Sequence, residues 1–262
     1  MSDQNETAAF LIIGNEILSG RTQDKNLSFL AHELNEIGIT LAECRVVRDV
    51  EDEIVSAVRQ LSATHTHVFT SGGIGPTHDD ITTASIGKAF GAAVNQHPEA
   101  LRALKEHYAG TDIELNEARL KMAIIPDGAS LIDNPVSKAP GFKLANVHVM
   151  AGVPRIFQAM VDQVLPELKH GKPTSSISIS AAVREGDVAE PLAKLQAQFP
   201  EVDLGSYPYH RDGELGTSLV ARSTNIEILK QVEVYLKEIV EYLGEQPFET
   251  RPEGKDGYEH AS

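Results

Sequence analysis

The sequence predicts an α/β protein: a three-layer α/β/α domain with a mostly parallel sheet, followed by a small α+β domain. Two observations lead to this class. Short, continuous apolar runs alternate with amphipathic segments in the first half of the chain, and such runs are typical of strands buried in a parallel sheet. Strand–helix alternation implies right-handed crossovers with helices on both faces. We predict domains over 1–172 and 173–248, and a flexible tail over 249–262.

The first three strand–helix units follow each other without a break. Apolar residues in Lys25–Ile37 recur at helical spacing, and Gly38 supplies the stop signal. In chain order, we predict a strand over Ala8–Ile13, a helix over Lys25–Ile37, a strand over Ile39–Val47, a helix over Val50–Leu61, a strand over His67–Ser71 and a helix over Asp79–Phe90.

The later elements rest on the same signals. Pro154 suits the first position of a helix, and Gly171-Lys172-Pro173-Thr174 is typical of a joint between domains. We predict helices over Pro98–Ala109 and Leu115–Ile125, a strand over Phe142–Met150 and a helix over 154–170; the second domain then has strands over Ser176–Arg184, Val202–Tyr207 and Thr217–Arg222, and helices over Ala189–Gln198 and Ile226–Leu243.

Composition limits the classes of function. The formal net charge of −15 argues against nucleic-acid binding, which needs clustered Lys and Arg. No apolar run approaches the roughly 20 residues that cross a bilayer, and Met1–Thr7 lacks the pattern of a secretion signal. We therefore predict a cytoplasmic protein without a membrane partner. Cys44 is the only cysteine and lies in an apolar stretch, where we expect a buried thiol.

The strongest motif is the glycine loop Thr70-Ser71-Gly72-Gly73-Ile74-Gly75-Pro76-Thr77-His78-Asp79-Asp80-Ile81-Thr82. Its three glycines stand between a predicted strand and a predicted helix, where backbone N–H groups can form an anion nest at a helix N-terminus. It matches neither a Walker loop nor G-x-G-x-x-G. The loop therefore predicts a site for a small phosphorylated ligand.

A simpler interpretation is a tight strand-to-helix turn in which Thr77 and Asp80 form a capping box. That interpretation leaves the three glycines and Asp79 unexplained. Paired carboxylates beside a phosphate would repel it unless a cation lies between them. Asp79 and Asp80 therefore predict a hard divalent metal with few protein ligands, as is usual for Mg²⁺.

Other loops at the same sheet edge carry polar residues. The first runs from Gly14 to Asn26, and within it Asp24 has the alternative role of capping the next helix. Asp49 follows the second strand and has the same alternative. Lys138-Ala139-Pro140-Gly141-Phe142 and Gly152-Val153-Pro154 are turn signals by default, although Lys138 could also reach a phosphate.

Together these segments resemble a known family. Gly14-Asn15-Glu16-Ile17-Leu18, Asp24 with Asn26, Asp49, Ser71–Thr82, Lys138–Phe142 and Gly152–Pro154 have the order and spacing of the N-terminal domain of competence/damage-inducible protein A (CinA), in the molybdopterin-binding superfamily. The resemblance covers 8–170, and the element order of 174–243 resembles the small domain that follows. Two departures stand out: Asn15 replaces a common Thr, and the chain stops before the deamidase domain of full-length CinA proteins, so deamidation is not expected.

The resemblance implies a site at the carboxyl ends of the strands. In the superfamily, the glycine loop and nearby acids hold a pterin or adenylated pterin with Mg²⁺. CinA-type domains are linked to metal-dependent hydrolysis of nucleotide pyrophosphates such as ADP-ribose, and a related domain of eukaryotic FAD synthases to FAD cleavage. By position, Asp80 matches the acid after the glycine loop, Asp24 and Asp49 match acids of the other two loops, and Asp79 matches the doubled acid of the CinA type.

Three functions stay open: a metal-dependent hydrolase of a nucleotide diphosphate linkage, which we favour; a molybdopterin-binding or transfer protein; and a non-catalytic interaction protein. For the hydrolase, the predicted catalytic acids are Asp24, Asp49, Asp79 and Asp80, with Mg²⁺, Mn²⁺ or Co²⁺ on Asp49, Asp79 and Asp80. The resemblance also implies a homo-oligomer. The predicted ligand-binding residues are Gly14, Asn15, Glu16, Asn26, Ser71, Gly72, Gly73, Gly75, Pro76, Thr77, Thr82, Lys138, Pro140, Gly141, Gly152, Val153 and Pro154.

Overall fold

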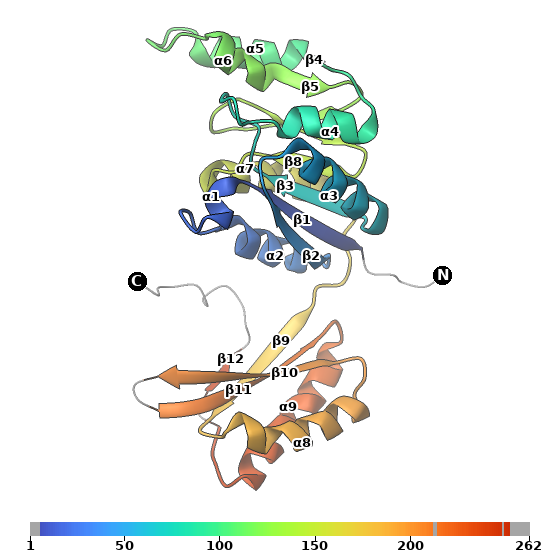
Figure 1. The fold of residues 1–262 in the computed structure, drawn as a ribbon. Helices are drawn as coiled ribbons and strands as arrows, with labels where there is room; N and C mark the ends of the chain where they lie inside the picture. Colours follow the sequence, from blue (N-terminus) through green and yellow to red (C-terminus); the bar gives the residue numbers. More distant parts are fainter. Residues whose placement is uncertain (1–5, 212–213, 248, 252–262) are drawn as a thin grey trace, which may run out of the picture. The chain divides into compact units, whose positions relative to one another are not determined.

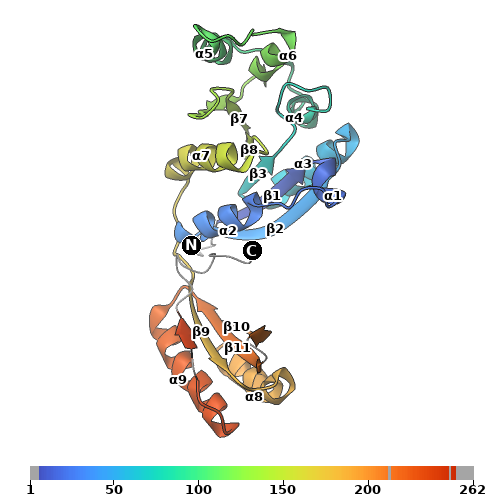
Figure 2. The ribbon, with the colours of Figure 1, turned by 90° about the vertical axis from the view of Figure 1, so that its left-hand side faces the viewer.

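The computed structural model describes residues 6–211, 214–247 and 249–251. The chain divides into two compact units, Met1–Lys172 and Pro173–Ser262 (Figures 1 and 2). The elements of the first unit are β1 (Thr7–Ile13), α1 (Asn15–Leu18), α2 (Asn26–Glu36), β2 (Thr40–Val47), α3 (Glu51–Thr64), β3 (His67–Ser71), α4 (Thr82–Phe90), β4 (Val94–Gln96), α5 (Pro98–Tyr108), α6 (Glu117–Leu120), the 3-10 helix η1 (Lys121–Ala123), β5 (Ile124–Pro126), β6 (Ser130–Ile132), β7 (Gly141–Leu144), β8 (Val147–Met150), α7 (Pro154–Val164) and the 3-10 helix η2 (Leu165–Glu167).

The first unit is built on a mixed sheet with the strand order β2-β1-β3-β8-β7-β6. Strands β2, β1, β3 and β8 run parallel to one another. β7 is antiparallel to both β8 and β6. The prediction of a mostly parallel sheet is therefore confirmed, and the parallel strands bring their carboxyl ends to one edge.

Helices cover both faces of this sheet. Alternate residues of β1 point to opposite faces: Phe10 packs with α2 and α7 in one core, and Leu11 packs with α3, α4 and α5 in the other. Both side chains are fully buried. This alternation in a strand that is apolar throughout confirms the three-layer α/β/α arrangement.

Two predicted elements of the first unit are wrong. Phe142–Met150 is not one strand but a hairpin, because the chain turns at Ala145 and Asn146 and Leu144 pairs with Val147. The predicted helix over Leu115–Ile125 is short, since α6 and η1 end where Ile124–Pro126 pairs with β4 as β5. In addition, α4 begins at Thr82 rather than at Asp79.

The second unit is a sheet with helices α8 and α9 packed into one core with it. Its strand order is β10-β11-β9-β12, and every pair is antiparallel. The predicted tail is wrong at 249–251, which pair with β9; its remainder, 252–262, lies outside the described residues. The elements are β9 (Ser175–Ala181), α8 (Glu185–Gln198), β10 (Asp203–Arg211), β11 (Glu214–Ser223), α9 (Ile226–Tyr242) and β12 (Glu249–Arg251).

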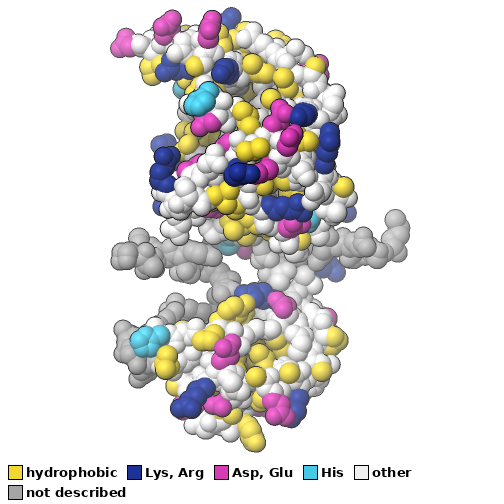
Figure 3. All heavy atoms as spheres, viewed as in Figure 1, with side chains coloured by type: hydrophobic (Ala, Val, Ile, Leu, Met, Phe, Trp, Pro, Cys, Tyr) yellow, Lys and Arg dark blue, Asp and Glu magenta, His cyan; other side chains and the backbone are white. Residues whose placement is uncertain are grey.

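Charged side chains of both signs lie on the surface: on the face in Figure 3, Lys and Arg side chains are interspersed with acidic and apolar ones. Cys44 lies on β2 and is exposed, so the expected core position is wrong. Although the residue reaches solvent, the surrounding protein atoms partly desolvate its thiol; this desolvation, with a smaller contribution from the Asp24 carboxylate, raises the pKa of the thiol to about 11. Within the described ranges, no helix is both long and apolar enough to span a bilayer.

Candidate functional site

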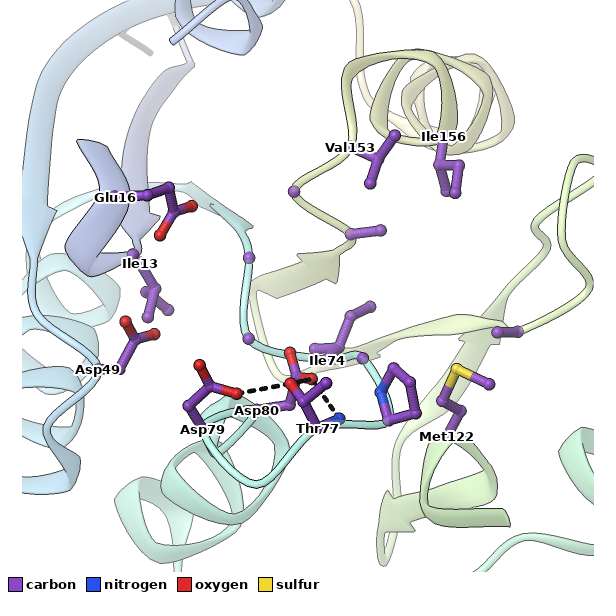
Figure 4. A pocket seen from close by; sticks show the side chains of 18 of the residues that line it. Ile13, Glu16, Asp49, Ile74, Thr77, Asp79, Asp80, Met122, Val153 and Ile156 are labelled. Carbon is purple, nitrogen blue, oxygen red and sulfur yellow. Dashed lines mark hydrogen bonds between the residues drawn. The ribbon is translucent and has the colours of Figure 1, made fainter. Parts of the chain in front are cut away.

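A cavity of about 550 Å³ opens at the carboxyl ends of the parallel strands (Figure 4). Loops that follow β1, β2, β3 and β8 contribute to its wall, as is usual for ligand sites of open α/β sheets. Its lining consists of Ile13, Gly14, Glu16, Thr22, Asp49, Gly72, Gly73, Ile74, Gly75, Pro76, Thr77, Asp79, Asp80, Met122, Asn134, Ser137, Ala139, Ala151, Gly152, Val153, Pro154 and Ile156.

Close backbone contacts shape the glycine loop. Gly72 has a φ of 107°, and a Cβ atom there would collide with the carbonyl oxygen of Ile13. A Cβ atom on Gly152 would lie 3.2 Å from the Cα atom of Gly72. Only glycine therefore fits at Gly72, because any side chain would push the loop away from β1.

The loop leaves backbone donors for a ligand. The Gly72 amide donates to Met150 O over 3.2 Å, and the Thr82 amide donates to Gly73 O over 2.9 Å. Within the part of the chain that the structure describes, the amides of Gly73, Ile74 and Gly75 donate no hydrogen bond. Consecutive free amides of this kind bind anions.

Three predicted ligand-binding residues of this region lie behind the cavity wall instead. Asn26, Ser71 and Thr82 are buried and do not line the cavity. The Thr82 hydroxyl donates to Gly72 O over 2.9 Å, and the Asn26 side chain donates to Ser71 Oγ over 2.8 Å. These side chains support the loop rather than offer contacts to a ligand.

The doubled acid is tied to Thr77. The Thr77 amide donates to Asp80 Oδ2 over 2.7 Å, and the Thr77 hydroxyl lies within hydrogen-bond distance of both carboxylates. The hydrogen bond from Thr77 is the largest cause that lowers the pKa of the exposed Asp79 carboxyl. The alternative interpretation as a capping box is wrong, because α4 begins at Thr82 and these contacts lie within the loop.

Two further carboxylates face the cavity from the β1 and β2 side (Figure 4). Glu16 belongs to the short helix α1, which replaces part of the predicted loop. Asp49 accepts a hydrogen bond from the Asn15 amide over 2.9 Å, so it does not cap α3, and Asn15 itself does not line the cavity. Asp24 lies outside the lining and accepts from the Leu27 amide over 2.8 Å, which is its alternative capping role.

The acids do not form a ready metal site. Among the described residues, no three His, Cys, Asp or Glu side chains are grouped so that they could hold a metal ion. The predicted set of Asp49, Asp79 and Asp80 is therefore not brought together, because Asp80 is held by Thr77 and Asp49 by the Asn15 amide. One or two of these carboxylates suit only a metal whose other ligands are water and ligand oxygens, which is common for Mg²⁺.

The loop 134–139 closes another side of the cavity, and Asn134 organises it. This side chain is 1% exposed, accepts from the amides of Val136 and Ser137, and donates to Ala139 O over 2.8 Å. Lys138 has a φ of 59° and pairs with Asp133 outside the cavity lining. The Lys138 amide donates to Asn134 O over 3.0 Å. Sequence reasoning selected Lys138 for its charge and missed Asn134.

Pro140 and Gly141 do not line the cavity either. A Cβ atom on Gly141 would collide with Val149 O, so this glycine serves the pairing of β7 with β8. The apolar part of the wall was also missed. Ile74, Met122 and Ile156 come from three separate segments (Figure 4), and their local patterns are those of ordinary core residues.

Two family models match this chain. The model described as "Probable molybdopterin binding domain" matches residues 9–170. The model described as "FAD synthase, middle domain" matches residues 173–244. The two matches fall within the first and the second unit, respectively.

Individual relatives agree with these matches. A protein of Pyrobaculum calidifontis is 37% identical over 211 residues, which cover 77% of this chain and 80% of that protein. A "Probable FAD synthase" of Caenorhabditis briggsae is 31% identical over 261 residues, which cover 90% of this chain. This chain spans half the length of that relative, since the match covers 50% of it.

One solved structure is similar to this chain in both fold and sequence. CinA of Thermoplasma acidophilum superposes with a TM-score of 0.57 at 34% sequence identity, covering 62% of this chain and 98% of that one. The model match over 9–170 takes in more than half of the chain, and the cavity lies wholly within it. The chain therefore belongs to the molybdopterin-binding domain family, and its first unit is of the CinA type.

Proposed function

We propose that the first unit binds a nucleotide diphosphate, such as ADP-ribose or FAD, and hydrolyses its diphosphate linkage with the help of a divalent metal. One observation carries this proposal: free loop amides, carboxylates and an apolar wall meet in one cavity. The amides of Gly73, Ile74 and Gly75 are the candidate phosphate donors. The FAD synthase relative supports a flavin nucleotide as one of the substrates to test.

We include a divalent metal in the proposal because the charged side chains that line the cavity are acidic. Glu16, Asp49, Asp79 and Asp80 line it, and none of the described lining residues is Lys, Arg or His. An anionic ligand would meet net repulsion from these carboxylates. A bound divalent metal, Mg²⁺ or alternatively Mn²⁺ or Co²⁺, would screen that repulsion and polarise a phosphoryl oxygen.

The apolar wall fits the remainder of a nucleotide. Met122 and Ile156 lie on the side of the cavity away from Glu16 and Asp49, whereas Ile74 lies beside Asp80 (Figure 4). Such uncharged side chains suit the face of a flat ring. A cavity of about 550 Å³ is within the range of ligand pockets for molecules of this size.

The proposed reaction is the transfer of a phosphoryl group to water. The water oxygen bonds to one phosphorus, and the bond from that phosphorus to the bridging oxygen breaks. The bridging oxygen leaves with the other phosphate, and ADP-ribose gives AMP and ribose 5-phosphate. The loop amides would stabilise negative charge on the phosphoryl oxygens, and an exposed carboxylate such as Asp79 would orient the water.

Product release tests the proposal. The full chain is incubated with ADP-ribose or FAD and with Mg²⁺, Mn²⁺ or Co²⁺, and AMP is measured by ion-exchange chromatography. We expect AMP with at least one metal, loss of AMP with EDTA, and a strong reduction in the Asp79→Asn variant. Folded protein that releases no AMP under any of the metals contradicts the proposed hydrolysis.

A second candidate is binding or transfer of molybdopterin or an adenylated pterin, which the family model favours by its description. The same amides and apolar wall would hold the pterin phosphate and ring. Titration calorimetry with molybdopterin measures this directly. Micromolar pterin affinity without hydrolysis of nucleotides would favour the second candidate, and the absence of affinity would exclude it.

A further inference from the structure

Asn26 is a polar side chain placed between two loops that line the cavity. It is the first residue of α2 and only 2% exposed. Its amide nitrogen donates to Ser71 Oγ over 2.8 Å and to Gly152 O over 2.9 Å. One carboxamide group thus joins segments that are 45 and 126 residues away along the chain.

Both hydrogen-bond partners of Asn26 belong to segments that line the cavity. Ser71 is followed directly by the glycine loop, and Gly152 lines the cavity together with Val153 and Pro154. The two backbones touch, since a Cβ atom on Gly152 would lie 3.2 Å from Gly72 Cα. The Gly72 amide also bonds to Met150 O over 3.2 Å. A small change at this contact therefore moves one wall relative to the other.

The chemistry of the contact requires an amide. A primary amide nitrogen carries two N–H donors, and Asn26 uses both on acceptors of different loops. Aspartate has the same shape but no donor, and it would place a carboxylate against a carbonyl oxygen. The Asn26 Oδ1 atom is buried and has no hydrogen-bond partner among the described residues. Leaving an acceptor unpaired costs stability, so the residue is poorly explained by stability alone.

We propose that Asn26 is a positioning residue that fixes the spacing between the glycine loop and the connection from β8 to α7. It touches the cavity wall only from behind and acts through Ser71 and Gly152. The loop residues Gly73, Ile74 and Gly75, whose amides are free, then line the cavity at a fixed distance from the first turn of α7, which also lines it. This role holds for any ligand of the cavity and does not depend on the proposed hydrolysis.

Hydrogen exchange of the full chain, resolved by NMR, tests the spacing without a ligand. The informative amides are those of Gly72 and Thr82 in one wall and of Ile156 and Phe157 in the other, because each makes a hydrogen bond within or between the walls. We expect Asn26→Ala to accelerate exchange at all four positions by about tenfold, since local opening becomes easier in both walls.

Asn146 provides the matched control. It is also an Asn that joins separate segments, with its amide nitrogen donating to Ser62 O over 3.0 Å and to His65 O over 2.9 Å. These partners lie at the amino-terminal side of β3, away from the cavity lining. We expect Asn146→Ala to accelerate exchange at Val68, whose amide donates to Asn146 O, and to leave the four wall amides unchanged.

Affinity for inorganic pyrophosphate with Mn²⁺, measured by calorimetry, gives the functional readout. We expect Asn26→Ala to weaken it at least tenfold, Asn26→Ser to give an intermediate value because one donor remains, and Asn146→Ala to match the parent chain. If Asn26→Ala does not fold, the serine variant decides the exchange experiment. Unchanged exchange, or acceleration in only one wall, overturns the positioning role whether or not pyrophosphate binds.

Discussion

At the scale of single residues, hydrogen bonding separates the two acids of the glycine loop. The Asp80 carboxylate accepts from the backbone amide of Thr77 as well as from its hydroxyl, and it packs against Gly75, where a Cβ atom would lie 2.7 Å away. Asp79 accepts from the hydroxyl of Thr77 but not from its amide, and its side chain is 62% exposed with the His78 imidazole 3.9 Å away. Asp80 therefore holds the loop, while Asp79 is free to meet a ligand.

Alanine variants of the two acids test this division. We expect Asp79→Ala to lower the proposed turnover of ADP-ribose at least tenfold while the free energy of unfolding changes by less than about 0.5 kcal/mol, as for most exposed sites. Asp80→Ala should lower both turnover and stability, the latter by about 1 kcal/mol for lost hydrogen bonds. Urea unfolding and AMP release measure the two quantities. Equal losses of stability in both variants would contradict the division.

A buried imidazole makes stability depend on pH. His148 is 1% exposed and stacks on Phe69 with ring centroids 4.9 Å apart. Neither ring nitrogen has a hydrogen-bond partner among the described residues. Burial, followed by the charges of Lys143 and His67, lowers the pKa of His148 to about 3. Burial is also the main cause that lowers the pKa of His67.

The direction of this pH dependence follows from the low pKa of His148, because its imidazole stays neutral in the folded protein. An unfolded His has a pKa of about 6.5, so stability is fully present above that pH. It is lost as the pH falls toward 3, where the folded His148 takes up its proton. Between pH 7 and pH 5 the loss from this group is about 2 kcal/mol, and its slope approaches roughly 1.4 kcal/mol per pH unit below pH 6.

His148→Phe should remove that part of the pH dependence. We expect the variant to lose about 2 kcal/mol less than the parent chain between pH 7 and pH 5, because Phe keeps the ring stack and has no proton to bind. Urea unfolding at the two pH values, followed by circular dichroism, measures the difference. His170→Gln, at an exposed position, is the control and should keep the parent's dependence. An identical loss in parent and His148→Phe would refute the assignment.

At the scale of elements, strongly patterned segments were predictable and irregular ones were not. β1 and α2 have continuous apolar or helical spacing, and both formed close to the predicted bounds. The hairpin of β7 and β8 was missed because its turn is Ala145-Asn146, without the glycine that usually marks a tight hairpin. Apart from Lys143 and His148 both strands are apolar, so the pair had the pattern of one long strand.

Cavity residues that belong to a local motif could be predicted, whereas those that only tertiary packing brings to the cavity could not. Local motifs identified Gly72, Gly73, Gly75, Asp79 and Gly152, which line the cavity. Motifs do not tell which side of a loop a residue faces, so Asn26 and Lys138 were included although neither lines it. Residues such as Met122 come from elements that only tertiary packing brings to the cavity, and spacing along the chain contains no signal for them.

The missed turn leads to a prediction at this scale. Ala145 has a φ of 53°, a region that costs a non-glycine residue about 1–2 kcal/mol. Ala145→Gly relieves this strain but gains freedom in the unfolded chain, worth about 0.4–1 kcal/mol. We therefore expect a net stabilisation of roughly 0.5 kcal/mol in urea unfolding.

The reverse substitution at a comparable position is the control. Gly91 ends α4 with a φ of 68°, and a Cβ atom there would meet no atom within 4 Å. Gly91→Ala should therefore lose roughly 0.5 kcal/mol, because the backbone strain is partly offset by the reduced freedom of the unfolded chain. A destabilised Ala145→Gly variant together with a neutral Gly91→Ala variant would show that φ does not govern either turn.

At the scale of the whole molecule, the two units have separate cores. Residues of β1, α2 and α7 form one core of the first unit, whereas the core of the second unit is drawn from β9, β11, α8 and α9. Every residue that lines the cavity lies in the first unit. Self-association, which the family resemblance implies, stays a prediction that light scattering can measure.

Because the two units have separate cores, we expect the first unit to fold and to bind its ligand without the second unit. We expect a fragment of residues 1–172 to fold and to bind pyrophosphate with Mn²⁺ within about twofold of the full chain, because its cavity is complete. The end of the fragment matters. The Gly171 amide donates to Ile37 O over 2.8 Å, and Gly38 packs against the backbone of Gly171 and Lys172.

A shorter fragment of residues 1–169 is therefore the matched control. It loses the hydrogen bond that ties the chain to the end of α2, so we expect it to be less stable than the 1–172 fragment by about 1 kcal/mol in urea unfolding. Its pyrophosphate affinity at low temperature should nevertheless match, because the lost contact lies at the opposite end of α2 from Asn26. A 1–172 fragment that folds but binds more than tenfold more weakly than the full chain would show that the second unit contributes to the site.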